Sequence, residues 1–292
     1  MTSVTPAPSA SETATTLPSA PASGGAGNGP SGEVGGAANP EVGGAGEPGP
    51  APTGVVDPGA EVIFEDDFES GSVGMGPADW DTFISYQVNP MNPQGDGTGA
   101  TIGTEQKHGG SQAIHFNGGS SPAMITRALP QGTNKIVVTA WVWMSRQLGN
   151  QAAESQNHET LIGIRAKPGD ANDEIRFGEI KGAIGVNEVP TDNIMPKLEQ
   201  WHTGESVAAM TWSCMEIVFA GDQPQHELHA WIDGKELLSI TSGDQWQNGN
   251  MPADWMKGKF TEVILGWQSF SNNTIDVWMD DVVVSTGRVG CR

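Results

Sequence analysis

The sequence predicts an all-β domain, an antiparallel jelly-roll β-sandwich, behind an N-terminal segment that has no fold of its own. Apolar residues after residue 59 recur with a period of two in several short runs, which is the pattern of strands. Gly, Asn, Asp and Pro turns separate these runs, and none of the runs has the 3.6-residue period of a helix. The chain has 292 residues, so residues 59–292 suffice for one large sandwich.

Residues 1–58 are expected to form a disordered linker. They contain no aromatic residue, no Lys and no Arg, and consist mostly of Ala, Gly, Pro, Ser and Thr. Such a segment has too little apolar surface to offset the entropy lost on ordering its backbone. Its first ten residues show no secretory leader. A spacer of this kind before a Trp-rich acidic domain is typical of secreted or surface-tethered proteins, although a disordered terminus on a cytosolic protein has the same composition.

The longest strand signal is Lys135–Met144. One face of this run would carry Ile136, Val138, Ala140, Val142 and Met144, and the other face Val137, Thr139, Trp141 and Trp143. Because both faces are largely apolar, the run predicts a central strand that is covered on both sides.

Shorter runs predict the remaining strands that we recognise. They are Glu159–Arg165, Glu174–Phe177, Met215–Ala220, Glu227–Ile232, Glu236–Ile240, Glu262–Trp267 and Ile275–Ser285. Asp233-Gly234 stands between two of them and indicates a tight hairpin, since a type I′ turn needs positive φ at both central residues.

The charge of the chain excludes some partners. The formal net charge is −21, with 14 Lys and Arg against 35 Asp and Glu. Binding of phosphate backbones needs clustered Lys and Arg, so nucleic acid is not an expected partner. No run of 18 or more apolar residues is present, so we expect no membrane span, and we expect a monomer.

Acidic residues stand near both ends of the predicted domain, in Glu65–Gly71 and Val277–Ser285. If these terminal segments pair as strands, as terminal strands of sandwiches often do, several carboxylates meet. Calcium, a hard cation that prefers oxygen ligands, would relieve their repulsion. A solvated acidic edge that discourages sheet aggregation explains the same residues equally well.

Six segments in order resemble the cellulose-induced, polysaccharide-lyase-like jelly-roll proteins that filamentous fungi and some bacteria secrete. The resemblance covers about residues 61–291 and implies a concanavalin A-like sandwich, an exported protein and a polysaccharide partner. The segments are Asp66–Gly71, His108–Gln112, Ala140–Trp143, Trp212–Glu216, Gly266–Ser271 and Val277–Cys291.

The resemblance also implies a structural calcium ion and a disulfide. The ion would be held by the side chains of Glu69, Gln112 and Asp280 and by the carbonyl of Gly109, with Gln112 in place of a shorter amide. Cys214 and Cys291 match positions joined by a disulfide in the family. Two unrelated buried thiols of a cytosolic protein are the alternative.

The family resembles polyuronate lyases, whose β-elimination needs a group that neutralises a carboxylate and groups that move protons. Arg176 matches the family's Arg, but Glu174 stands where a His is expected. The expected Gln is replaced by Ile180, and the two expected Tyr by Val186 and Phe270. Arg176 could grip a carboxylate, or it could pair with Glu174 or Glu179.

Arg176, Glu174 and His158 are therefore the candidate catalytic residues of a degenerate lyase site, although a His in the position of His158 is more often structural. The 10 Trp residues suggest stacking on sugar rings, and we take Trp201, Trp212 and Trp246, in irregular stretches, as candidate carbohydrate-binding residues. Trp141, Trp143, Trp267 and Trp278 lie in predicted strands, where core packing is expected.

Three functions remain. The first is an exported polysaccharide-binding protein without full lyase machinery, and the second is a polyuronate lyase. The third, a glycoside hydrolase, needs two carboxylates on one strand face, and the Glu-x-Asp-x-x-Glu arrangement typical of jelly-roll glucanases is absent. We rank them in that order.

Overall fold

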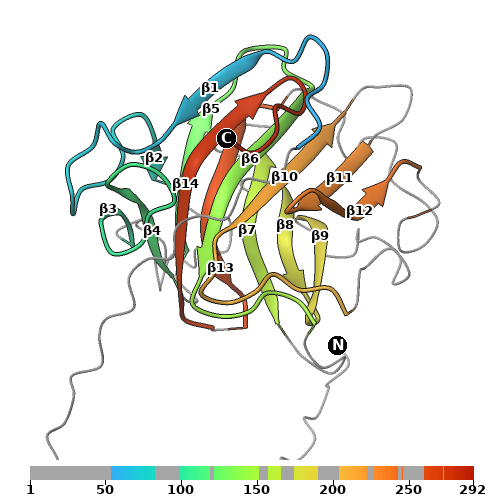
Figure 1. Ribbon diagram of the computed structural model, residues 1–292. Coiled ribbons are helices and arrows are strands. Elements are labelled where there is room, and N and C mark those ends of the chain that lie inside the picture. The colour runs from blue at the N-terminus through green and yellow to red at the C-terminus, as the bar shows by residue number, and fades with distance from the viewer. Residues whose placement is uncertain are drawn as a thin grey trace, which may run out of the picture. The chain divides into compact units, whose positions relative to one another are not determined.

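The computed structural model describes residues 54–82, 99–118, 122–150, 157–165, 174–189, 204–221, 227–242, 245, 260–271 and 273–292. Most of the expected linker, residues 1–58, lies outside these ranges, and its disorder stays a prediction. The described residues form two antiparallel sheets that pack face to face as a sandwich (Figure 1).

The larger sheet, called sheet A, contains the central strand that the sequence predicts. Its order is β12 (Lys235–Ile240), β11 (Glu227–Ile232), β10 (Ser213–Ala220), β6 (Lys135–Met144), β14 (Ile275–Ser285), β4 (Ala113–Gly118) and β3 (Ala100–Gly103), with β1 (Val62–Asp66) also paired to β14. β6 lies between β10 and β14, and the five residues of its first face all belong to the core between the sheets. The period-two interpretation of this strand is therefore confirmed.

The smaller sheet, called sheet B, carries the candidate catalytic residues. Its order is β2 (Asp81–Thr82), β5 (Ala123–Ala128), β13 (Glu262–Ser269), β7 (His158–Arg165), β8 (Glu174–Ile180) and β9 (Ala183–Val189). Ile175 and Phe177 of β8 belong to the core between the sheets. Because side chains alternate along a strand, Glu174 and Arg176 point to the other, outer face of sheet B.

The terminal strands pair as expected, but the acidic opening segment is not extended throughout. β1 runs antiparallel to β14, from Val62 opposite Ser285 to Asp66 opposite Val282. The strand ends at Asp66, and Phe68 has a φ of 57°, in the left-handed region. The expectation that the segment Glu65–Gly71 pairs as a strand therefore holds only for Glu65 and Asp66, and Glu69 lies in the turn that follows the strand.

The hairpin signal is correct. Asp233 and Gly234 join β11 to β12, and both have positive φ, 50° and 78°. The strands β2 to β5 and β9 were not recognised in the sequence. They are short, or interrupted by polar residues and Gly, so their alternation is weak.

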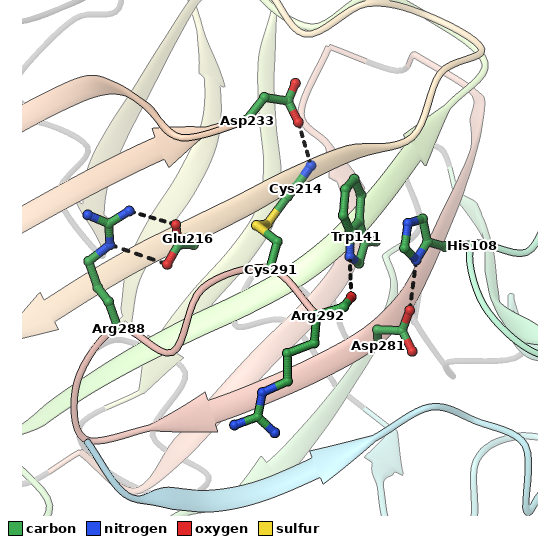
Figure 2. The surroundings of a disulfide bond; sticks show 9 residues. All are labelled: His108, Trp141, Cys214, Glu216, Asp233, Asp281, Arg288, Cys291 and Arg292. Carbon is green, nitrogen blue, oxygen red and sulfur yellow. Dashed lines mark hydrogen bonds and ion pairs between the residues drawn. A yellow bond between two sulfur atoms is a disulfide. The ribbon is translucent and has the colours of Figure 1, made fainter. Parts of the chain in front are cut away.

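A disulfide joins Cys214 of β10 to Cys291, as the resemblance implies, with their Cα atoms 6.1 Å apart. The residues after β14, here called the C-terminal segment (residues 286–292), cross the outer face of sheet A beside this bond (Figure 2). Arg288 of this segment pairs with Glu216 of β10, and the carbonyl of Arg292 accepts a hydrogen bond from the Trp141 indole of β6.

Candidate functional site

Four charged side chains follow one another across the outer face of sheet B. Glu262, Arg165 and Glu174 stand opposite one another on β13, β7 and β8, and Arg176 is two residues further along β8. We call these four residues the charge row. Arg165 Nη1 lies 2.8 Å from Glu262 Oε2, and Arg165 Nη2 lies 2.9 Å from Glu174 Oε1. Arg176 donates through Nε (2.8 Å) and Nη2 (2.6 Å) to Glu174 Oε2.

The charge row is almost completely covered by protein. The exposed fractions of Arg165, Glu174 and Arg176 are 6%, 1% and 2%. Buried charges are tolerated only when they are paired, and here two arginines alternate with two glutamates. Of the two roles left open for Arg176, pairing with Glu174 is the one that the structure contains.

His158 joins this region from the start of β7. Its Nε2 lies 3.2 Å from the amide nitrogen of Asn187 on β9, and Asn187 is the cross-strand partner of Arg176. Its ring centroid is 4.8 Å from that of Phe270, and the Arg176 guanidinium lies 5.2 Å from the Phe270 centroid. The structure thus brings the three candidate catalytic residues together, and we call Glu174, Arg176, His158, Asn187 and Phe270 the sheet-B patch.

Asn187 was not identified from the sequence. The strand that carries it, β9, was not recognised, so nothing indicated that an amide stands beside Arg176. The charged members of the sheet-B patch are buried, whereas His158 and Phe270 are partly exposed. A ligand on this face would therefore meet the imidazole and the phenyl ring first.

The residues expected to hold calcium gather around the loop His108–Gln112. Glu69 Oε1 accepts hydrogen bonds from the backbone nitrogens of Ser111 (2.6 Å) and Gln112 (2.8 Å). Asp280 Oδ2 accepts from the backbone nitrogens of His108 (2.8 Å) and Gly109 (3.1 Å). Glu69 and Asp280 thus approach the same loop, and the expected crowding of carboxylates occurs nearby, around a cavity of about 390 Å³ lined in part by Glu65, Asp66, Asp67, Asp79 and Asp281.

The donor chemistry fits a hard cation at Glu69 and Asp280 and fits it less well at Gln112. Asp280 is 1% exposed, and its burial, followed by the charge of Asp281, raises its pKa to about 7. A bound cation would stabilise the ionised carboxylate and so offset the cost of burying it. Gln112 instead donates from Nε2 to the backbone carbonyls of Phe68, Glu69 and Gly71, so its amide nitrogen competes with a cation for these oxygens. Among the described residues, no three His, Cys, Asp or Glu side chains form a metal cluster.

Comparison with known proteins agrees with this architecture. A family model described as "Polysacc_lyase-like: Cip1-like, core domain" matches residues 67–287, most of the chain. The chain belongs to this Cip1-like family. No curated protein matches it.

One solved structure supports the same fold. The structure titled "Cellulose induced protein, Cip1" is 23% identical, covers 78% of this chain and 100% of its own, and has a TM-score of 0.56. An endo-1,3-beta-glucanase from Streptomyces sioyaensis is 13% identical, with coverage of 79% and 98% and a TM-score of 0.48. At these identities the first likeness establishes the β-sandwich of the Cip1-like domain and not its activity.

A second polar cluster lies on the inner side of sheet B in the Cip1-like domain. Glu159 and Glu179 are cross-strand partners on β7 and β8, 2% and 0% exposed. Arg146 lies 3.8 Å from Glu159 Oε1 and 3.5 Å from Glu179 Oε1. Burial raises the pKa of Glu159 to about 7, although a hydrogen bond from Asn273 lowers it. Glu179 points to the inner side of β8, opposite to Glu174 and Arg176, and both carboxylates are enclosed next to Arg146. They are therefore not accessible as a hydrolase pair.

The tryptophans of the Cip1-like domain divide between the two layers. Trp267 lies in the core between the sheets, and Trp141, Trp143 and Trp278 are buried on the outer face of sheet A. Trp212, partly exposed, packs against the cluster of Ala113, Trp143 and Trp278, so it stands on sheet A and not in the sheet-B patch. Trp201 and Trp246 lie outside the described residues, and their carbohydrate-binding role stays a prediction.

Proposed function

We propose that this chain is an exported polysaccharide-binding protein of the Cip1-like family that lacks complete lyase machinery. The observation that carries the proposal is the engagement of Arg176, whose Nε and Nη2 both donate to Glu174 on the outer face of sheet B. A lyase would use such a guanidinium to neutralise the carboxylate of its substrate. Here a protein carboxylate already takes that position.

The proton-moving groups of a lyase are equally constrained. Glu174, at the position of the expected His, accepts hydrogen bonds from both Arg165 and Arg176, so its lone pairs are already engaged. The partly exposed end of the patch offers groups suited to binding. Phe270 can stack on the C–H face of a sugar ring, and the imidazole of His158, which lies beside the buried amide of Asn187, can exchange hydrogen bonds with hydroxyl groups.

Affinity electrophoresis of the full chain through gels that contain neutral and acidic glycans tests the proposal. We expect at least one glycan to retard the protein, and we expect Phe270→Ala and Asn187→Ala to reduce the retardation. Asn117→Ala, which removes an exposed amide from sheet A, is the matched control and is expected to have no effect. The absence of retardation by every glycan would overturn the proposal.

Polyuronate lyase activity is the second candidate, because one observation favours it. His158, a possible base, lies 3.2 Å from the Asn187 amide, which could take the role of the expected Gln. Incubation with glucuronan, alginate and pectate tests this function through the ultraviolet absorbance of unsaturated uronates. Product that forms with the wild type, and is lost in both His158→Ala and Arg176→Ala, would replace the binding-only proposal.

A calcium ion would serve this protein as a structural clamp. The carboxylates of Glu69 and Asp280 and the carbonyl of Gly109 would hold it and join the turn after β1 to β14. Gln112 would contribute through its amide oxygen in place of the nitrogen that now faces the carbonyls. The ion would stabilise the fold without an open position for substrate.

Export is supported by the disulfide, since disulfides persist in oxidising compartments. Along the described ranges, no helix has the length and apolar character needed to span a membrane. An N-terminal linker would then separate the domain from whatever precedes or anchors it.

A further inference from the structure

We propose that the polysaccharide recognised at the sheet-B patch is uncharged, a neutral pyranose polymer and not a polyuronate. This inference rests on the proposed function and names the substrate class of the same site. The feature that carries it is the charge row Glu262, Arg165, Glu174 and Arg176, which neutralises itself before any ligand arrives.

Selection of a polyuronate requires a cation that gains a partner when the sugar carboxylate binds. In the charge row the two guanidinium groups already have carboxylate partners at 2.6–2.9 Å, and Glu174 bridges both of them. Charge-assisted pairs of this length are strong, so a sugar carboxylate would have to displace Glu174 to reach Arg176. The exchange replaces one carboxylate by another and yields no new ion pair.

The burial of the two arginines adds a desolvation cost to the binding of a charged ligand. Arg165 and Arg176 are 6% and 2% exposed, so a sugar carboxylate must lose its hydration shell to approach them. Desolvation of an ion costs free energy that is offset only when the ion pairs with an opposite charge that has no other partner. A hydroxyl group loses far less hydration and can be satisfied by neutral donors and acceptors.

The accessible end of the patch is made of such neutral groups. Phe270 presents a ring and His158 an imidazole, both partly exposed, whereas the Asn187 amide, 3.2 Å from His158 Nε2, is 2% exposed. A neutral imidazole has one donor and one acceptor nitrogen, which matches a hydroxyl group better than it matches a carboxylate, an acceptor only.

The charges around the patch act in the same direction. On the inner side of β7 and β8, Glu159 and Glu179 both lie close to the guanidinium of Arg146. Residues 59–292 contain 30 acidic and 14 basic residues, which gives this part of the chain a formal charge of −16. A polyanion is therefore repelled at long range, and the repulsion is greatest at low ionic strength.

The test compares neutral β-glucans and xylan with glucuronan, alginate and polygalacturonate, by affinity electrophoresis and calorimetry on the full chain. We choose about 10 mM salt, where screening is weakest, and about pH 8, where imidazole side chains are ordinarily neutral. We expect a neutral glycan to bind and the polyuronates to bind at least about tenfold more weakly, a difference that shrinks as salt is added.

Glu262→Gln tests whether the charge row sets this preference. Glu262 is the most exposed member of the row, with a side chain 19% exposed, so its neutralisation is expected to leave the fold intact and to give the charge row a net charge of +1. We expect this variant to gain polyuronate binding at low salt. Glu61→Gln, which removes the same charge from an exposed residue before β1, is the control and is expected to gain none.

The outcomes separate the two proposals. Polyuronate that binds the wild type more tightly than any neutral glycan, and loses that binding in Phe270→Ala, would overturn the neutral substrate and keep the binding function. A Glu262→Gln chain that binds polyuronates no better than Glu61→Gln would also overturn the inference. Retention of no glycan at all would overturn the binding function itself.

Discussion

Arg288 of the C-terminal segment and Glu216 of β10 form an ion pair of 2.7 Å (Figure 2). Glu216 is 1% exposed, and the Arg288 guanidinium also lies 4.0 Å from the Trp231 ring centroid. The same segment carries Cys291, so an ion pair and a disulfide both fasten it to β10. The end of the chain is therefore part of the fold of sheet A, and its attachments can be tested separately.

Arg288→Ala should destabilise the domain strongly. The substitution leaves the buried Glu216 carboxylate without its cation, a change that typically costs about 3–5 kcal/mol. Urea unfolding monitored by tryptophan fluorescence measures the free energy of unfolding. Arg292→Ala is the control, because the Arg292 and Glu65 side chains are 51% and 63% exposed, and loss of such a pair costs at most about 1 kcal/mol. Equal losses in the two variants would contradict this prediction.

Removal of the disulfide should lower the free energy of unfolding by roughly 2–5 kcal/mol, since the bond closes a loop of 77 residues and restricts the unfolded chain. The measurement compares urea unfolding of Cys214→Ser/Cys291→Ser with the wild type, both before and after treatment with a reductant. The reductant should shift only the wild type. A wild type that reductant does not destabilise would show that the bond contributes little.

The centre of the sandwich was predictable because it depends on local alternation. Lys135–Met144 has apolar residues on both faces, and that pattern alone predicts a strand that lies between two neighbouring strands and is covered on both faces. The turn after β1 was not predictable in this way. The left-handed conformation of Phe68 depends on hydrogen bonds of the Asp66 carboxylate, which also binds the Trp80 indole, and no sequence period reports such a contact.

The members of the candidate site were predictable, and so was the pairing of Arg176 with Glu174 as one alternative, whereas the rest of the charge row was not. Arg176, Glu174 and His158 could be selected by their resemblance to family positions, but the charge row also needs Glu262, which is 97 residues from Arg165. The register between β13, β7 and β8 decides this neighbourhood, and register follows from packing across the sheet. For the same reason Asn187, on a strand that was not recognised, could not be placed beside His158.

The free energy of unfolding should fall as the pH rises from about 4.5 to about 7, in part because of Glu159. Burial raises its folded-state pKa to about 7 from the model-peptide value of 4.5, so the folded state binds the proton more tightly than the unfolded state. The charged groups around Glu159 are Glu179 and Arg146, and both are present in the wild type and in the variant described next.

Glu159→Gln isolates this contribution. Urea unfolding of wild type and variant at about pH 5 and about pH 8 should show a smaller loss of stability in the variant, by of the order of 1–3 kcal/mol. The amide oxygen of Gln can still accept the hydrogen bond from Asn273, so the comparison changes mainly the ionisable proton. Parallel pH profiles for the two proteins would show that Glu159 does not titrate in this range.

Calcium should raise the midpoint of thermal unfolding, and a chelator should lower it, if Glu69 and Asp280 clamp an ion between the turn after β1 and β14. Asp280→Asn should abolish the calcium-dependent shift, because it removes a carboxylate ligand, and magnesium should not replace calcium since it demands smaller, octahedral sites. Asp276→Asn is the control on the same strand, with its side chain 53% exposed, and should keep the shift. A wild type whose midpoint ignores both calcium and chelator would mean that the Gln112 amide, which already satisfies the carbonyls of Phe68, Glu69 and Gly71, has taken the place of the ion.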